Sequence, residues 1–328
     1  MEIVVLNHKE IEGLLPIDEC IDVMSEVLSA LARGEAHNPL RSVVCPPDTG
    51  HFLGLMPAYR GGDNPAYALK EVCIFPDNPT RGLDAHQGSV LLHSAETGEL
   101  MAVMNGSAIT AIRTAAVSGL ATKLLARDDA KEVAIIGTGV QGQTHLQAMA
   151  ALGGFERVRV CSRRRENAEA FARELGPKMP FTIEPVDDVK SAVESADVIN
   201  TTTNAREPVL HRDWVKPGAH INAVGSSIST TREIDTATMT ASTLFVDRRE
   251  STLNESGDYL FAAKEGAIGP DHIRAELGEV LIGERLGRRS PEEITLFKSL
   301  GLAVEDLASA QFLYKRALEK NVGARLDF

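Results

Sequence analysis

The pattern of apolar and polar residues in the first 125 positions predicts an amphipathic helix, then several strands, then a buried helix. Apolar side chains recur at helical spacing at Ile17, Ile21, Met24, Leu28 and Leu31, and a glycine at position 34 ends this pattern. Strands are predicted over residues 41–46, 51–59 and 66–75, followed by a hairpin over 89–106. Residues 108–125 are rich in alanine and poor in charge, which is typical of a buried helix.

The pattern changes at residue 131, where short apolar runs begin to alternate with helical stretches of about ten residues. The apolar runs predict strands at 131–137, 157–162, 197–203, 219–225 and 242–247. Strands and helices in alternation predict an α/β fold with a doubly wound parallel sheet of the Rossmann type. After about residue 250 we expect mostly helix, and residues 291–320 predict one or two amphipathic helices.

Composition narrows the class of protein. A chain of 328 residues is long enough for two domains, and its formal net charge of −12 argues against nucleic acid or an anionic membrane as partner. We see no apolar run near the roughly 20 residues of a membrane span and no signal peptide, so a cytoplasmic protein is expected. The four cysteines are scattered, which favours reduced thiols, and the nine histidines show no metal-binding spacing, so no metal site is expected.

A glycine motif follows the apolar run that begins at residue 131. The segment Gly137-Thr138-Gly139-Val140-Gln141 continues to Gly142, and a helix and a second strand are predicted after it. In this context the first glycine allows a tight turn, the second lets the backbone approach a pyrophosphate, and the third allows close packing of helix and strand. The helix N-terminus stabilises the anion. The motif therefore predicts a dinucleotide site; a glycine turn without nucleotide is the alternative.

An arginine run stands where NAD-binding chains carry an acidic residue. Twenty residues after the last glycine of the motif is Ser162, followed by Arg163, Arg164 and Arg165. A carboxylate at this place bonds the ribose 2′-hydroxyl, whereas guanidinium groups suit a 2′-phosphate. Arg163 and Arg164 therefore favour NADP(H) over NAD(H), and Arg165 is expected to be solvated. In the alternative interpretation, the whole run is a solvated helix entry in which a single arginine makes a contact.

Two cations occupy places where charge is unfavourable without a partner, and a third is a candidate to join them. Lys70 shares the apolar face of its predicted strand, and Arg113 is the only charge between residues 108 and 122. Arg41 lies just before another predicted strand. If the three converge, they form a site for a small carboxylate, whereas structural salt bridges are the alternative.

Several segments resemble the ornithine cyclodeaminase/mu-crystallin family. The matching segments are AIRTAAVSGLATK, GTGVQ, SRRRENAEAFA, WVKPGAHINAVGS, REID, ESGD and FKSLGLAVED. The resemblance implies a homodimer with a Rossmann domain over residues 119–303. It also implies an α+β domain for substrate binding and dimerisation, over residues 1–118 and completed by a helix at 304–328.

The resemblance also implies roles for individual residues. Arg41, Lys70 and Arg113 would hold the α-carboxylate of the substrate. The residues expected along the cofactor are Thr114, Thr201, Thr203, Val224, Gly225, Ser299 and Leu300. The arginine run is closer to the NADPH-using mu-crystallin pattern than to the acidic pattern of the cyclodeaminases.

One departure bears on the reaction. Cyclodeaminases carry an Asp two residues after the glycine of NAVG, and Ser227 stands there in this chain. A serine hydroxyl without a partner is a poor general base. The sequence thus favours an oxidoreductase that transfers hydride between NADP(H) and an α-imino or amino acid, with Lys70, His86 or solvent as proton donor. A lyase of the cyclodeaminase type with recycled NAD, and a non-catalytic nucleotide-binding protein, are the alternatives.

Overall fold

The computed structural model describes residues 2–47 and 49–328 and divides the chain into two units. The first comprises Met1–Arg113 with Leu302–Phe328, and the second comprises Thr114–Gly301. The boundary between them falls within helix α3 (Gly106–Leu125). Sequence analysis places the corresponding boundaries at 118/119 and 303/304.

The first unit is built on one mixed sheet whose strand order is β16-β1-β7-β6-β5-β4-β2, with β3 pairing to β4. Only the β1–β7 pair is parallel among the described strands of this sheet. The strands are β1 (Glu2–Leu6), β2 (Ala36–His37), β3 (Ser42–Val44), β4 (Phe52–Arg60), β5 (Ala66–Ile74), β6 (His86–Ser94), β7 (Leu100–Asn105) and β16 (Ala324–Asp327). The strands and the hairpin predicted between residues 41 and 106 are confirmed.

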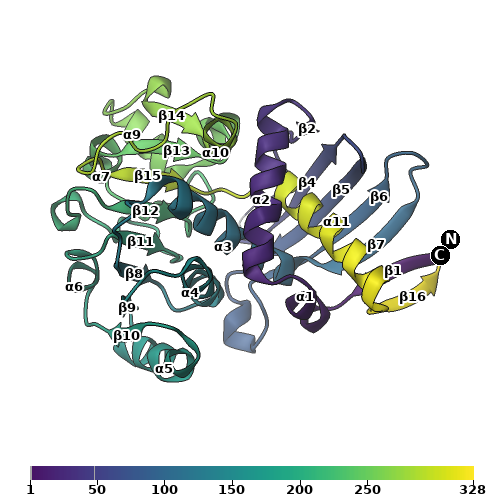
Figure 1. The fold of residues 1–328 in the computed structure, drawn as a ribbon, viewed down its shortest axis with the longest axis horizontal. Coiled ribbons are helices and arrows are strands. Elements are labelled where there is room, and N and C mark those ends of the chain that lie inside the picture. The colour runs from purple at the N-terminus through teal and green to yellow at the C-terminus, as the bar shows by residue number, and fades with distance from the viewer. Residues whose placement is uncertain (1, 48) are drawn as a thin grey trace. The chain divides into compact units, whose positions relative to one another are not determined.

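Helices of the first unit pack on one face of this sheet. They are α1 (His8–Leu14), α2 (Ile17–Ala32) and α11 (Ala303–Lys320), with a short 3-10 turn η1 (Asn78–Arg81). Figure 1 shows α2 and α11 lying across the strands. The apolar stripe of α2 is buried, and Gly34 has a φ of +74°, which ends the helix as expected. The alternate side chains of β5 point away from these helices.

Helix α3 confirms the helix predicted over 108–125 and begins two residues earlier, so that it spans 20 residues. By length and composition alone it could cross a membrane, but 83% of its most apolar stretch is buried inside the protein. That burial is typical of a core helix, and the alanines at positions 115, 116 and 121 allow neighbours to approach closely.

The second unit contains a sheet in which every neighbouring pair is parallel. Its order is β10-β9-β8-β11-β12-β15-β13-β14. The strands are β8 (Glu132–Ile136), β9 (Arg157–Cys161), β10 (Thr182–Pro185), β11 (Val198–Thr201), β12 (His220–Ala223), β13 (Thr243–Val246), β14 (Ile273–Glu276) and β15 (Thr295–Lys298). The predicted doubly wound parallel sheet is confirmed.

Helices connect these strands as the alternating pattern requires. They are α4 (Val140–Leu152), α5 (Arg165–Leu175), α6 (Val189–Val193), α7 (Thr236–Ala241), α8 (Arg249–Glu255), α9 (Gly257–Lys264) and α10 (Leu277–Leu281). The 3-10 turns are η2 (Gly176–Lys178), η3 (Arg212–Trp214) and η4 (Pro270–His272). The strand order reverses between β8 and β11, and ligands of such sheets bind at the carboxyl ends of the strands near this point.

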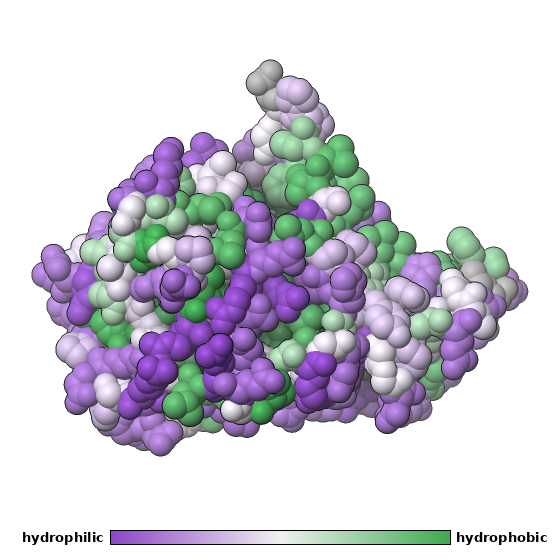
Figure 2. Space-filling model, turned by 90° about the horizontal axis from the view of Figure 1, so that it is seen from above, coloured by the Kyte–Doolittle hydropathy of each residue, from purple (hydrophilic) through white to green (hydrophobic). Residues whose placement is uncertain are grey.

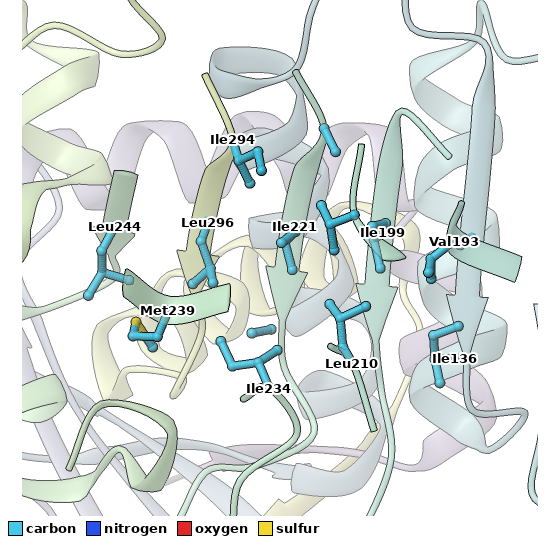
Figure 3. Packing of buried hydrophobic residues seen from close by; sticks show 14 of the residues in the cluster. Ile136, Val193, Ile199, Leu210, Ile221, Ile234, Met239, Leu244, Ile294 and Leu296 are labelled. Carbon is cyan, nitrogen blue, oxygen red and sulfur yellow. The ribbon is translucent and has the colours of Figure 1, made fainter. Parts of the chain in front are cut away.

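A hydrophobic core covers one face of the parallel sheet. Figure 3 shows Ile136, Ile199, Ile221 and Leu296 on neighbouring strands, with Leu210 and Ile234 on the segments packed against them. All are nearly or fully buried. In β12 and β15 these apolar side chains alternate with His220, Asn222 and Thr295, which face the other side of the sheet. These polar side chains are buried and hydrogen-bonded to one another.

The expectation of mostly helix after residue 250 is wrong in part. Residues 295–298 form β15, a central strand between β12 and β13, and residues 273–276 form β14 at the edge. The last long helix therefore begins only at residue 303. A buried strand of four residues is too short to be distinguished from a helix segment by periodicity.

Candidate functional site

Lys70 lies on β5 and is buried, with 2% of its surface exposed. Its ammonium group is 3.0 Å from Oδ1 of Asp306, which lies in the first turn of α11. The expectation that this lysine needs an anionic partner is therefore confirmed, and the partner comes from the far end of the chain. Both ions are nearly without solvent, so each depends on the other for compensation of its charge.

Arg113 joins the same ionic cluster from helix α3. Its Nε donates to Asp306 Oδ1 at 3.0 Å, and its Nη1 donates to Glu305 Oε2 at 2.8 Å. One carboxylate oxygen of Asp306 thus serves two cations at once. Lys70 and Arg113 are brought together, and both also have the structural salt bridges that the sequence left open.

The charge of Arg41 reaches the same cluster. Burial lowers the pKa of Lys70 to about 8; the charge of Asp306 opposes this shift, while the positive charges of Arg113 and Arg41 add to it. The pKa of His86, at the start of β6, is also lowered. Burial is the largest cause, and the positive charges of Lys70 and Arg113 add to it. The ring of His86 still keeps exposed surface. The first unit thus brings Lys70 and Arg113 together, with the charge of Arg41 acting on Lys70 and with His86 in range of both.

The second unit carries the predicted glycine turn between β8 and α4. Gly137 has a φ of +109°, and a Cβ there would lie 2.6 Å from the carbonyl oxygen of Thr202. A Cβ on Gly142 would lie 2.1 Å from the carbonyl oxygen of Gly137, whereas one on Gly139 would meet nothing within 4 Å. The turn therefore leaves open space beside Gly139, at the N-terminus of α4, where backbone N–H groups can bind an anion. The residues present fit the pyrophosphate of a dinucleotide.

The end of β9 lies beside this turn. The hydroxyls of Thr138 and Ser162 are 3.2 Å apart. Arg163 and Arg164 are exposed, and neither forms an ion pair within residues 2–47 and 49–328. Arg165, by contrast, bonds Glu169 at 2.8 Å and also pairs with Asp187. Two guanidinium groups of the run are therefore available to a phosphate, and the third is engaged.

The other residues expected along the cofactor follow neighbouring strands. Thr201 ends β11, Gly225 comes soon after β12, and Leu300 comes soon after β15, all at the carboxyl edge that also carries the glycine turn after β8. Thr203, Val224 and Ser299 accompany them, and Thr114 lies in α3. The backbone N–H of Leu300 donates to Asp247 Oδ2 at 2.6 Å, so a buried carboxylate fixes this loop.

Sequence reasoning missed the carboxylates that complete these groups. Glu305 and Asp306 are a charged pair inside the apolar run that begins α11, and that contrast is the signal that could have found them. Glu233 likewise stands beside the apolar Ile234 and is fully buried. Among the residues that the structure describes, no three His, Cys, Asp or Glu side chains gather as metal ligands would.

Relatives of known activity match nearly the whole chain. Ketimine reductase mu-crystallin of Mus musculus is 43% identical over 281 residues, covering 86% of this chain and 85% of that protein. Delta(1)-pyrroline-2-carboxylate reductase of Thermococcus litoralis, solved in complex with NADH and L-proline, is 40% identical with a TM-score of 0.95 and covers 98% of this chain and 99% of that one. An archaeal alanine dehydrogenase dimer with bound NAD is 33% identical with a TM-score of 0.93, covering 100% of both chains.

These relatives confirm the expected fold and the expected class of reaction, an NAD(P)-dependent oxidoreductase. The sequence model of the ornithine cyclodeaminase/mu-crystallin family matches residues 1–321. The resemblance noted from single segments therefore extends over nearly the full length. The chain belongs to the ornithine cyclodeaminase/mu-crystallin family.

Proposed function

We propose that this protein reduces a cyclic α-imino acid, such as pyrroline- or piperideine-2-carboxylate, to the amino acid with NADPH. The observation that carries the proposal is the buried cluster in which Lys70 and Arg113 share one oxygen of Asp306, with the charge of Arg41 acting on it. The relatives named for ketimine and pyrroline-2-carboxylate reduction support the substrate class.

The three cations bind the substrate carboxylate in this proposal. Lys70 and Arg113 are held in place by their ion pairs with Glu305 and Asp306, and the positive charge of Arg41 acts on Lys70. Guanidinium and ammonium groups orient a carboxylate through several hydrogen bonds, which places the imine carbon for reaction.

The nucleotide site supplies the second substrate. The turn at Gly137–Gly142 holds the pyrophosphate, and Arg163 and Arg164 bind the 2′-phosphate, so NADPH is preferred over NADH. The reduced nicotinamide, when bound, supplies a hydride to the imine carbon. The proton on the product nitrogen enters with the iminium ion or is donated by Lys70 or His86.

The protein acts as a homodimer in this proposal, and the sheet of the first unit supplies the interface. On the face opposite α2 and α11, cross-strand pairing aligns a row of apolar side chains that retain exposed surface: Val5, Pro57, Leu69, Leu91 and Val103. Val43 and Val44 on β3 are half exposed and add further apolar surface. Figure 2 shows apolar side chains reaching the surface on the face that it draws. We expect a second copy of this chain to cover the surface, because the archaeal alanine dehydrogenase, which matches over its whole length, is a dimer. Exposed apolar patches of this kind mark interaction sites.

We also propose a cytoplasmic location. The four cysteines at positions 20, 45, 73 and 161 are all free thiols. Free thiols, including the exposed one at position 45, are typical of a reducing compartment.

The decisive experiment follows NADPH absorbance on mixing the protein with pyrroline-2-carboxylate and piperideine-2-carboxylate, in parallel with NADH. We expect turnover of both imines, faster with NADPH. Ammonia release from ornithine without net change in the cofactor would instead select a lyase. Absence of turnover with either imine would refute the proposed substrate class.

The same assay tests the arginine run. Arg163→Ala and Arg164→Ala remove the groups assigned to the phosphate, so KM for NADPH should rise about tenfold per arginine while KM for NADH stays unchanged. Arg165→Ala is the matched control, because Arg165 already pairs with Glu169 and Asp187. Equal effects of all three variants on both cofactors would show that the arginine run is only the solvated start of helix α5 and does not bind the 2′-phosphate.

A further inference from the structure

Three buried charged side chains that the proposed function does not use meet in the second unit. Glu233 of REID, Asp258 of ESGD and Lys298 of FKSL are at most 2% exposed. They come from a loop before α7, the first turn of α9 and the end of β15. Three buried ionisable groups from distant segments form a single cluster.

Glu233 binds the loops that follow two neighbouring strands. Its Oε1 accepts from the backbone N–H of Thr203 at 2.6 Å and from the Thr203 hydroxyl at 2.7 Å. Its Oε2 accepts from the Thr201 hydroxyl at 2.8 Å and from the backbone N–H of Gly225 at 2.7 Å. One carboxylate therefore ties the end of β11 to the end of β12.

Asp258 and Lys298 hold Glu233 in this position. Asp258 Oδ1 accepts from the backbone N–H groups of Glu233 at 2.7 Å and Ile234 at 3.2 Å. Its other oxygen lies 2.9 Å from the ammonium of Lys298. Lys298 also donates to the carbonyl oxygens of Ala223 at 3.1 Å and Ser226 at 2.6 Å, so it fixes the chain on both sides of Gly225.

The two loops that Glu233 joins are in very close contact. A Cβ on Gly225 would lie 2.1 Å from the carbonyl oxygen of Thr203 and 2.5 Å from Glu233 Oε1. Ser226 further bonds Thr231, which closes the loop that contains Ser227. Small displacements of this carboxylate are therefore transmitted directly to Thr203 and Gly225.

A buried ionic cluster contributes little to the stability of a domain, because replacing it with apolar side chains of similar volume often leaves the stability unchanged or raises it. What charged hydrogen bonds supply is a defined geometry at each donor. We propose that Glu233, held by Asp258 and Lys298, is a positioning residue that sets the places of Thr203 and Gly225 along the cofactor. This inference rests on the proposed function in assigning those two residues to the cofactor.

The test compares Glu233→Gln with Asp197→Asn. Glutamine keeps the size of the side chain but replaces one carboxylate oxygen with an NH2 group. That group cannot accept the two hydrogen bonds that the oxygen accepted. Asp197 is a matched control, since it also accepts hydrogen bonds from two backbone N–H groups, those of Lys131 and Glu132. It lies just before the start of β11, whereas Thr201 lies at the end of that strand. Asp258→Asn is a second variant, which keeps the bonds to Glu233 and Ile234 but removes the charge facing Lys298.

We measure NADPH binding by fluorescence, then kcat with saturating imine, and the unfolding midpoint of each variant. The inference predicts that Glu233→Gln and Asp258→Asn weaken NADPH binding or lower kcat about 10- to 100-fold, as expected for misplaced groups. Asp197→Asn is expected to lower the unfolding midpoint but to leave both constants within about twofold of wild type.

Loss of stability in all three variants with unchanged binding and turnover would overturn the inference. A wild-type protein that binds NADPH but reduces neither imine would refute the proposed substrate alone. In that case, the binding constants of the three variants still decide the role of Glu233.

Discussion

Asp306 controls the charge state of the cation cluster, because its Oδ1 accepts from both Lys70 and Arg113. Without a carboxylate beside it, a lysine as buried as Lys70 would lose its proton more easily still. Burial, the larger effect, lowers the pKa of Lys70, and the charge of Asp306 raises it; together they leave this pKa at about 8. In the proposed function, a substrate carboxylate binds the protonated form.

This balance predicts a pH dependence at the scale of one residue. Because Lys70 is protonated below about pH 8 and neutral above it, kcat/KM for the imine should fall as pH rises through about 8. Asp306→Asn removes the charge that raises the pKa of Lys70, so the fall should move to lower pH. The measurement is the pH profile of kcat/KM at saturating NADPH.

Lys70→Arg is the control for this prediction, because an arginine stays charged throughout the range. Its profile should lack the fall assigned to Lys70 and keep only the titration of the imine itself. Identical profiles for wild type and Asp306→Asn would show that Lys70 does not titrate in the reaction.

The turn between β8 and α4 illustrates how an element prepares a binding site. Two of its glycines are required by packing, because a Cβ on Gly137 or Gly142 would collide with backbone oxygens at 2.6 and 2.1 Å. The third, Gly139, has open space where its Cβ would be. Sterics thus separate the glycines that build the turn from the one that, in the proposed function, faces the pyrophosphate.

Two alanine variants test this separation. Gly142→Ala forces the backbone apart and should cost about 1–3 kcal/mol of the free energy of unfolding, with weaker NADPH binding as well. Gly139→Ala should leave the free energy of unfolding within about 0.5 kcal/mol of wild type but weaken NADPH binding, because the new methyl occupies the anion site. Denaturant unfolding and NADPH titration distinguish the two effects. Equal NADPH affinity of Gly139→Ala and wild type would place the pyrophosphate elsewhere.

At the scale of the whole molecule, the sheet of the first unit has two different faces. One is covered by α2 and α11, and the other presents a cross-strand row that includes Leu69 and Leu91. Apolar side chains that remain accessible on a continuous sheet face are typical of an interface.

Leu69→Glu tests the proposed dimer. A charge in the middle of the row should weaken self-association at least about tenfold, because it must be desolvated on association. Leu286→Glu is the control, since Leu286 is an exposed leucine of the second unit, with 69% of its surface accessible. Sedimentation velocity gives the oligomeric state, and circular dichroism checks that both variants are folded. A Leu69→Glu protein that remains a dimer would exclude this face.

The sequence determined the features that depend on neighbouring residues. The period of apolar residues specified α2 and the strands β4 to β7, and the glycines at 137 and 142 specified a turn that only glycine can form. The same local reasoning showed that Lys70 and Arg113 each need an anion, because a charge on an apolar face is costly alone. These conclusions required no knowledge of the rest of the chain.

The tertiary structure decided which distant groups meet. Asp306, the partner of Lys70, is 236 residues away along the chain, and Lys298 reaches the carbonyl of Ser226 across 72 residues. The run at 295–298 became a central strand because the sheet has a place for it between β12 and β13, not because its own pattern requires a strand. Local sterics and periodicity act over a few residues, whereas the pairing of buried charges and the order of strands follow from how the whole chain packs.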